Sequence, residues 1–240
     1  YKKVSDLAIC VQADNCIKTA LGRHNTNTKN KISIGKNSII NLMLRKSFEI
    51  PAFMDEHEIT ALLNFYKTLP KTPNSGVEKK AYTTGFPIES LPFKDLMPRL
   101  EKVFGKFGVT VSMFLEEFDP WNVHSDYFKD DANPYYAVLI PLEVQDKITH
   151  TLVFNELGDD KDWKRKLQVK KNFKYSSYEL QLLSHVRTSL LSTLSIDTLY
   201  KWHPGKLIAW RRNLLHSSDN FPIGGLEKKT ALVLFLNKDD

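Results

Sequence analysis

Two residues with metal-binding side chains, His124 and Asp126, stand two positions apart in the stretch PWNVHSDYF. In a β-strand, alternate side chains point to the same face with their Cα atoms roughly 6 to 7 Å apart, so both residues could reach one ion. A third ligand would have to come from another strand. His216, in GKLIAWRRNLLHSSDNF, is the candidate, because it ends an apolar run and precedes a loop. The three residues therefore form a candidate metal site.

Two imidazoles and one carboxylate on one side of a metal ion leave the opposite positions open, which suits Fe(II) that works on O2. Such an enzyme needs a second substrate to supply two electrons, and an anionic one must be held by a fixed cation. Lys229 opens the final apolar strand, and alternation places it on one face with Ala231, Val233 and Phe235. Lys228 beside it could equally be the inward residue, and the sequence leaves this choice open.

The elements that must position these residues are short β runs broken by turn residues, and they predict a mostly antiparallel sandwich or barrel. Two helices are predicted before them: one carries Ile59, Leu62, Leu63 and Tyr66 on one face, and the other spans Lys94 to Phe104 with Pro98 in its first turn. The predicted strands are Phe48 to Ile50 and residues 109–118, 122–127, 135–143, 150–156, 206–213 and 229–237.

Residues 157–200 interrupt the strands as an insertion, with a lysine-rich loop and a helix predicted from Ser177 to Leu194. Residues 70–92 are expected to form a second loop at the mouth of the barrel. The polar stretch 24–38 indicates a linker or mobile loop. We therefore expect a basic N-terminal segment at 1–45 and one domain at 46–240, and the first residue, Tyr1, indicates a piece of a longer chain with neighbouring domains.

The net charge of +6 arises in residues 1–45, where eight Lys/Arg and two Asp occur, so residues 46–240 sum to zero. An enzyme that works on duplex nucleic acid would be expected to line its working face with cations, so nucleic acid is not the expected partner. The local cluster at 161–174 is interpreted as a solvated surface. No apolar run is long enough for a membrane span and no secretory signal is evident, which predicts a cytoplasmic protein in which Cys10 and Cys16 are reduced thiols.

The order of these parts resembles the 2-oxoglutarate/Fe(II)-dependent dioxygenase superfamily and, within it, the prolyl-4-hydroxylase-like branch. The resemblance covers about residues 46–240. It rests on the strand-and-helix entry FEIPAFMDEHEITALL, the HSD tripeptide, the strands YYAVLIPLE and THTLVFNE, the Gly-x-Leu-x-x-Trp run leading into a single histidine, and a basic residue that starts the last strand.

The resemblance implies a double-stranded β-helix, or jelly roll, with Fe(II) bound by His124, Asp126 and His216. Lys229 would hold the distal carboxylate of 2-oxoglutarate, whose other carboxylate and keto oxygen chelate the metal. O2 would complete the reaction, which yields succinate, CO2 and usually a hydroxylated small molecule or peptidyl side chain; ascorbate is a further cofactor that the resemblance admits. The family's tyrosine on the strand before His-x-Asp is missing, and the candidates for that second contact to 2-oxoglutarate are Thr151, Tyr136 and Asn155.

Other residues with chemical potential are assigned structural or surface roles. Trp121 and Trp210 are expected to pack in the core, and one of Arg211 and Arg212 should point inward, where it could bind an anionic substrate. The remaining histidines lack a carboxylate at metal-ligand spacing or lie outside the β core; they are His24, His57, His150, His185 and His203. Two other functions stay open: a zinc-dependent hydrolase or isomerase on a cupin-like barrel, which leaves Lys229 without a role, and a non-catalytic binding module.

Overall fold

The computed structural model describes residues 46–73, 81–128, 133–159, 162–170 and 174–239. The expectations for residues 1–45, including both cysteines and the basic segment, lie outside this range, as do Lys161 and Lys171 of the lysine-rich cluster.

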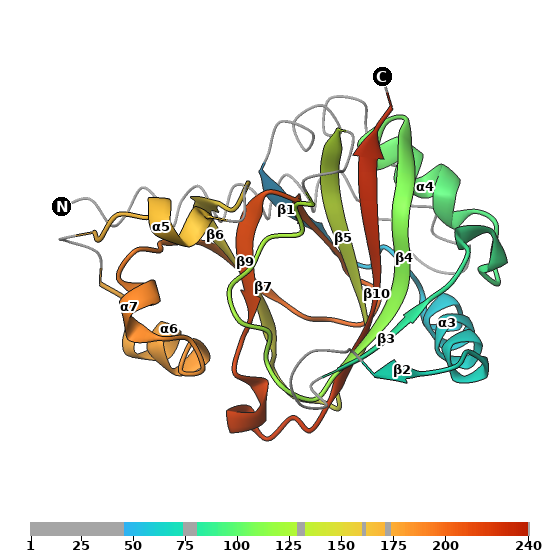
Figure 1. Cartoon of the computed structure of the whole chain (residues 1–240). Helices are drawn as coiled ribbons and strands as arrows, with labels where there is room; N and C mark the ends of the chain where they lie inside the picture. The colour runs from blue at the N-terminus through green and yellow to red at the C-terminus, as the bar shows by residue number, and fades with distance from the viewer. Residues whose placement is uncertain (1–45, 74–80, 129–132, 160–161, 171–173, 240) are drawn as a thin grey trace, which may run out of the picture.

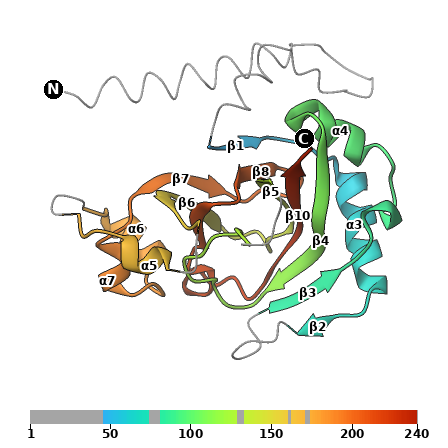
Figure 2. The same ribbon diagram turned by 45° about the horizontal axis from the view of Figure 1, so that its top comes forward.

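The larger of the two sheets in the described chain is antiparallel and has seven strands (Figure 1). Its hydrogen-bonded order is β1 (Ser47–Ile50), β8 (Leu207–Arg211), β5 (Pro134–Glu143), β10 (Lys229–Lys238), β4 (Phe107–Glu117), β3 (Ala81–Gly85) and β2 (Thr72–Pro73). A smaller sheet has the order β7 (Ile196–Lys201), β6 (His150–Leu157) and β9 (Leu214–Ser218). The two sheets face each other, as Figure 2 shows, and the apolar layer between them includes Trp202 and Leu214 from the small sheet side and Trp210 from the large sheet.

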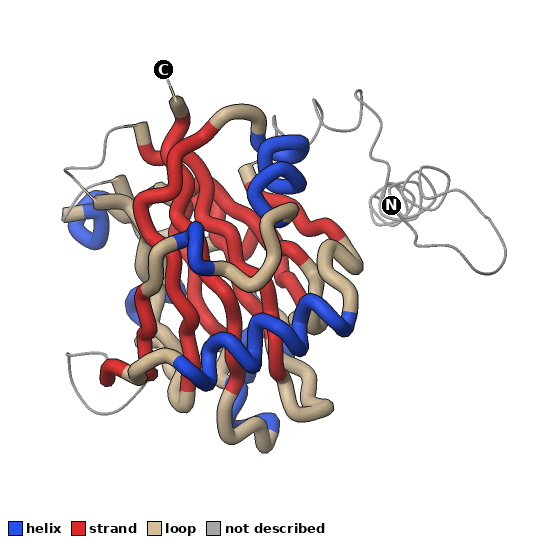
Figure 3. The backbone as a smooth tube through the Cα atoms, turned by 90° about the vertical axis from the view of Figure 1, so that its right-hand side faces the viewer, coloured by secondary structure: helices blue, strands red, loops and turns tan. Residues whose placement is uncertain are grey.

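The two long helices cover the outer face of the large sheet. Helix α3 (Glu56–Thr68) lies obliquely across its strands, and α4 (Leu96–Phe104) packs beside it (Figure 3). Asp55 caps α3 by accepting a hydrogen bond from the Glu58 N–H, while the Glu58 side chain accepts from the Asp55 N–H. The 3-10 turn η1 (Ile88–Ser90) joins β3 to this layer. Both predicted helices are confirmed, including Pro98 in the first turn of α4.

Period-two alternation explains why the large sheet can be buried on both faces. On β10, Leu232, Leu234 and Leu236 pack toward the helices, whereas Ala231, Val233 and Phe235 face the small sheet. The predicted common face of Ala231, Val233 and Phe235 is therefore confirmed. A strand buried on both faces is apolar at nearly every position, which is why the stretch ALVLFL was readable as a core strand.

The outer face of the small sheet is covered by short helical turns from the 157–200 segment: α5 (Trp163–Lys166), α6 (Ser177–Leu182) and α7 (Thr188–Leu191). The 3-10 turn η2 (Phe221–Gly224) follows β9. The single helix predicted from Ser177 to Leu194 is wrong, because the chain leaves helical geometry after Leu182 and buries Leu183 and Val186 in the layer beneath. The segment also ends in β7, the edge strand of the small sheet, which the prediction of a loop-and-helix insertion missed.

Three further expectations need correction. Residues 122–127 form an extended segment with one isolated bridge at His124 rather than a strand. Residues 70–92 contain β2 and β3, which extend the large sheet, rather than a loop alone. His216 lies inside β9, a strand of the small sheet, because the chain turns between β8 and β9 and crosses from one sheet to the other.

Among the described residues, no helix combines the length and the apolar character needed to cross a lipid bilayer.

Candidate metal centre

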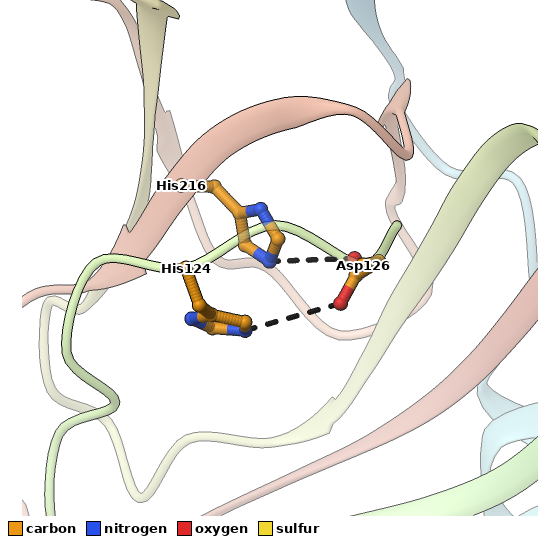
Figure 4. A group of neighbouring side chains, drawn as sticks. All are labelled: His124, Asp126 and His216. Atoms are coloured by element: carbon orange, nitrogen blue, oxygen red, sulfur yellow. Dashed lines mark ion pairs between the residues drawn. The ribbon is translucent and has the colours of Figure 1, made fainter. Parts of the chain in front are cut away.

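The backbones of His124 and His216 are hydrogen bonded to each other. The His124 N–H donates to the His216 carbonyl at 3.0 Å, and the His216 N–H donates to the His124 carbonyl at 2.9 Å. This antiparallel bridge ties the extended segment after β4 to β9. Both imidazoles project to the same side of the bridge, toward Asp126 (Figure 4). Although the predicted strand is absent, the extended backbone still turns His124 and Asp126 toward one point.

Asp126 is held by the turn between β8 and β9. Its N–H donates to the Arg212 carbonyl at 2.9 Å, and the Arg212 guanidinium donates back to the Asp126 carbonyl through Nε at 3.1 Å and Nη2 at 2.9 Å. The side chain of Arg212 is buried and also donates to Asn237 at 2.7 Å. Arg212 is thus the inward member of the arginine pair, and its guanidinium is hydrogen bonded to the backbone of the segment that carries Asp126.

The Asp126 carboxylate itself is held by Trp210. The indole Nε1–H of Trp210 donates to Asp126 Oδ2 at 3.2 Å, and the Trp210 ring lies 4.7 Å from the His216 ring between centroids. Trp210 therefore contacts two members of the triad at once. The expected core packing of Trp210 is confirmed by its burial, but its hydrogen bond to the carboxylate was not foreseen.

The donor atoms of the three residues all lie within 4.8 Å of one another. His216 Nε2 is 3.3 Å from Asp126 Oδ2, and His124 Nε2 is 3.9 Å from Asp126 Oδ1. In each ring the other nitrogen, Nδ1, faces a backbone carbonyl: that of Leu214 at 3.1 Å for His216 and that of Asn122 at 2.7 Å for His124. A carbonyl only accepts hydrogen bonds, so Nδ1 carries the proton in the neutral ring and Nε2 presents a lone pair.

Three electron-pair donors therefore converge, and this arrangement is repulsive unless a cation lies between them. Burial lowers the pKa of His216 to about 4, and the neighbouring His124 adds to this effect against the attraction of Asp126. At neutral pH the His216 imidazole is thus uncharged, the state in which histidine binds a metal. The backbone carbonyls that fix Nδ1–H are the partners commonly found behind metal-bound histidines. The residues present fit a divalent metal ion.

The triad opens into a pocket of about 240 Å³ between the two sheets. Its wall is apolar apart from the triad and a few polar side chains at one end. The residues that line it are Thr83, Met113, Leu115, Glu117, Trp121, His124, Asp126, Phe128, Leu139, Thr151, Trp202, Trp210, His216, Ser217, Ser218, Val233 and Phe235.

At the polar end, Lys229 lies behind the pocket wall. Its side chain is fully buried, and among the described residues its Nζ finds no well-formed hydrogen bond. The Nζ lies 4.1 Å from the ring centroid of Trp202 and 4.8 Å from that of Phe221, and it forms an ion pair with Glu117 Oε2 at 3.5 Å. Burying an ammonium group is costly unless it is well paired, and the ion pair with Glu117 is long, so Nζ keeps room for a further hydrogen-bond acceptor on the pocket side.

Lys228 points the other way. Its Nζ lies 3.1 Å from Glu116 and 3.3 Å from Glu143, and the side chain is partly exposed. Glu116 also binds Lys71 at 2.7 Å, on the face of β4 that carries α3. Of the two adjacent lysines, the structure places only Lys229 between the sheets.

Of the three candidates for a second contact to the anion, the structure places one in the pocket and two elsewhere. Thr151 lines the pocket, and its hydroxyl accepts a hydrogen bond from the Trp202 indole at 2.8 Å. Tyr136 is buried on the opposite face of the large sheet, among the residues that contact α4. Asn155 donates to Ser195 outside the pocket. Only Thr151 is therefore in a position to contact a ligand there.

Glu117 is the pocket residue that the sequence analysis missed. It stands directly opposite Lys229 in the β4–β10 register and accepts a hydrogen bond from the Ser218 hydroxyl at 2.8 Å. Burial raises the pKa of Glu117, and Lys229 and Ser218 oppose that rise. The alternation of Met113, Leu115 and Glu117 along one strand was a signal that could have identified it.

The other histidines within the described residues lie away from the triad. His150 pairs with Asp219 at 3.0 Å, His185 lies 3.2 Å from the Trp121 carbonyl, and His57 and His203 are exposed. These positions agree with the structural or surface roles expected for them. His24 lies outside the described residues.

Comparison with known proteins finds no matching family model and no matching curated protein. Several solved structures share the fold. A 2OG-Fe(II) oxygenase family oxidoreductase from Burkholderia pseudomallei is 12% identical, with a TM-score of 0.51 over 90% of this chain and 93% of that chain. The non-heme alpha ketoglutarate dependent carbocyclase SnoK from nogalamycin biosynthesis is 12% identical, with a TM-score of 0.52 over 84% of each chain.

A prolyl-4-hydroxylase from Pseudomonas putida is 8% identical, with a TM-score of 0.50 over 84% of this chain and 97% of that chain. At these identities the likeness speaks for the fold. The resemblance seen in the sequence is confirmed at that level: the described chain is mostly β with flanking helices and has the double-stranded β-helix fold of the 2-oxoglutarate/Fe(II) oxygenases.

Proposed function

We propose that the chain is a non-haem Fe(II)- and 2-oxoglutarate-dependent oxygenase that hydroxylates a small molecule or an amino-acid side chain and releases succinate and CO2. The observation that carries this proposal is the combination of two features, one inside the pocket and one directly behind its wall. Three lone-pair donors converge at one point, and a buried ammonium group without a well-formed hydrogen bond lies at the polar end. A metal ion and an organic anion together would satisfy both features.

His124, Asp126 and His216 would hold the metal, and Lys229 with Thr151 would bind the distal carboxylate of 2-oxoglutarate. Bound Fe(II) would supply the O2 chemistry, in which 2-oxoglutarate, O2 and the substrate C–H give succinate, CO2 and the substrate C–OH. The chain itself keeps both imidazoles in the metal-binding tautomer through the backbone carbonyls at Nδ1. The apolar wall around them excludes water from the reacting groups.

Two of the solved structures support this ligand set, one by what it contains and one by the cosubstrate in its description. The epimerase SnoN was crystallised in complex with Fe3+, alpha ketoglutarate and nogalamycin RO, and its chain is 14% identical to this one with a TM-score of 0.50. The carbocyclase SnoK is likewise alpha ketoglutarate dependent. The diversity of these reactions is a reason to leave the identity of the substrate open and to test cosubstrate turnover first.

The remaining pocket surface favours an apolar part of the substrate. Met113, Val233 and Phe235 line the wall away from Lys229. Phe128, half exposed at 51%, packs against Phe235 with the two rings tilted and 6.0 Å between their centroids. Apolar walls with a few placed polar groups are typical of small-molecule sites. A flexible side chain or a small ring would fit such a surface better than a charged polymer.

The test is 2-oxoglutarate-dependent formation of succinate by the full chain, purified without oxygen and then supplied with Fe(II) and O2. We expect turnover that disappears in His124→Ala and Asp126→Ala because each loses a donor. Exposed His203 provides the matched control, and His203→Ala should keep the activity of the unmodified chain. Lys229→Met should bind the metal normally but require much more 2-oxoglutarate, because the methionine keeps the volume and removes the charge.

Succinate formation that survives both triad substitutions would refute the proposal. The zinc alternative makes the opposite prediction: hydrolase or isomerase activity with zinc and without 2-oxoglutarate, and no dependence on Lys229. Metal analysis of the protein purified without oxygen distinguishes the two before any substrate is known.

A further inference from the structure

The proposed anion site already contains an anion. Glu117 of β4 and Lys229 of β10 are directly paired across the sheet, with Nζ and Oε2 3.5 Å apart and side chains 0% and 3% exposed. Glu117 also lines the pocket. The rest of the surroundings of the ammonium are aromatic, with Trp202 and Phe221 on either side. An incoming carboxylate would therefore have to share Lys229 with the Glu117 carboxylate.

The groups that face Glu117 do not compensate a second negative charge. From β10 it faces the single positive charge of Lys229, and from β9 the neutral Ser218. Asp219 is close enough to raise the pKa of Glu117, and it is itself paired with His150 of β6 at 3.0 Å. On the other side, the β3 residue opposite Glu117 is an alanine. Two carboxylates at one buried ammonium would leave an excess negative charge out of water.

Buried carboxylates in this situation are stabilised when one of them takes a proton, because the like charges are then replaced by a hydrogen bond. We propose that binding of 2-oxoglutarate is coupled to the uptake of one proton by Glu117, whose carboxyl group then donates a hydrogen bond to the distal carboxylate of the cosubstrate. This inference rests on the proposed function. In this step the Glu117 carboxylate takes one proton from solvent and becomes a carboxylic acid, and no other covalent bond forms or breaks.

The direction of the shift supports the coupling. Burial already raises the pKa of Glu117 in the free protein, and a second carboxylate beside it raises the pKa further. At a pH between these two pKa values, Glu117 is ionised in the free protein and protonated in the complex with 2-oxoglutarate. Over that range the affinity for 2-oxoglutarate falls tenfold for each unit of rising pH, because each binding event consumes one proton.

The test is isothermal titration calorimetry of the full chain, loaded with Mn(II) and titrated with 2-oxoglutarate at pH 7 in two buffers with different heats of ionisation. The difference between the two apparent enthalpies gives the number of protons taken up. We expect proton uptake that approaches one per cosubstrate when the titration is repeated across the pH range between the two pKa values of Glu117, where the dissociation constant rises by up to tenfold for each pH unit. Binding with no proton uptake and no pH dependence would overturn the inference.

Glu117→Gln provides the second measurement, since the amide keeps the shape and can donate to a carboxylate without titrating. We expect this variant to bind 2-oxoglutarate without proton uptake and with a dissociation constant that does not change with pH, so that it binds more tightly than the unmodified chain at the high end of the pH range. Glu116→Gln is the matched control: the neighbouring residue is equally buried but faces Lys71 and Lys228, so proton uptake should be unchanged.

The outcomes separate the two proposals. If 2-oxoglutarate fails to bind the unmodified chain and both variants at every pH, the cosubstrate assignment itself fails, and this inference fails with it. If it binds the unmodified chain and Glu117→Gln equally well and without proton uptake, only the role of Glu117 is overturned. The measurement on the unmodified chain stands alone if Glu117→Gln does not fold.

Discussion

The hydrogen bond from Trp210 to Asp126 offers a direct test of how the metal centre is organised. The substitution Trp210→Phe removes the Nε1–H that donates to Asp126 Oδ2 at 3.2 Å and keeps an aromatic ring beside His216. Asp126 then keeps its backbone contacts to Arg212 but loses the only side-chain donor that the described residues provide to its carboxylate. The carboxylate becomes free to rotate away from the imidazoles.

The magnitude follows from the type of interaction. A hydrogen bond to a charged acceptor contributes about 1.5 to 3 kcal/mol, and the loss of a partner behind a metal ligand typically weakens metal binding 10- to 100-fold. At 1.4 kcal/mol for each factor of ten, the two ranges agree. A carboxylate without the indole donor is also a slightly stronger electron donor, which opposes the loss. We therefore expect a weakening of about tenfold, at the lower end of that range.

The assay is calorimetric titration with Mn(II) in the absence of 2-oxoglutarate, with circular dichroism to show that the variant is folded. Trp202→Phe is the matched control: it also removes a buried indole N–H, but that group donates to Thr151 at the other end of the pocket. Mn(II) affinity should therefore be unchanged in the control. Equal losses in the two variants would show that general loosening of the core, and not the hydrogen bond to Asp126, sets the metal affinity.

Two further predictions concern stability. Gly205 has φ +76°, and a Cβ there would lie 2.4 Å from the Met54 carbonyl oxygen. Gly205→Ala should therefore lower the free energy of unfolding, measured by urea denaturation, by about 2 kcal/mol or more. At Gly85 the nearest contact of a Cβ is at 3.9 Å, so Gly85→Ala should lower it by less than about 1 kcal/mol. Burial alone would raise the pKa of Glu116, but hydrogen bonds from its two lysine partners outweigh it and lower the pKa below 4.5. The stabilisation from this carboxylate is therefore present above pH 4.5 and is lost as pH falls through the lowered pKa, so the stability difference between the unmodified chain and Glu116→Gln should shrink in acid; a difference that stays constant down to pH 3 would contradict this assignment.

The long core strands and the composition of the triad were readable from sequence because their signals are local. The apolar runs of β5 and β10 and the helical spacing around Leu62 are properties of contiguous residues. His124, Asp126 and His216 were identified by type, spacing and order along the chain. The structure places these three side chains together, while their binding of a metal stays a prediction.

The errors have a common physical origin, which is that pairing across strands is not encoded in neighbouring residues. Short strands such as β3 and β9 pair with longer partners that offer them free backbone groups. The sequence LLHSS of β9 has little strand character, and AYTTG of β3, despite its tyrosine and threonines, is only five residues long. Likewise, nothing near Glu117 in the sequence shows that Lys229 stands opposite it. That juxtaposition depends on the register between β4 and β10.

The mutual backbone hydrogen bonds of His124 and His216 have a consequence for the choice of ion. They fix the spacing of the two imidazoles before any ion arrives, so little ordering entropy is lost on coordination. The pair also fixes the kind of donor, because each imidazole presents a nitrogen to the same point. First-row divalent ions accept imidazole nitrogen readily, whereas Ca²⁺ prefers six to eight oxygen ligands. The backbone pairing thus selects the ion by the chemistry of the donors that it brings together.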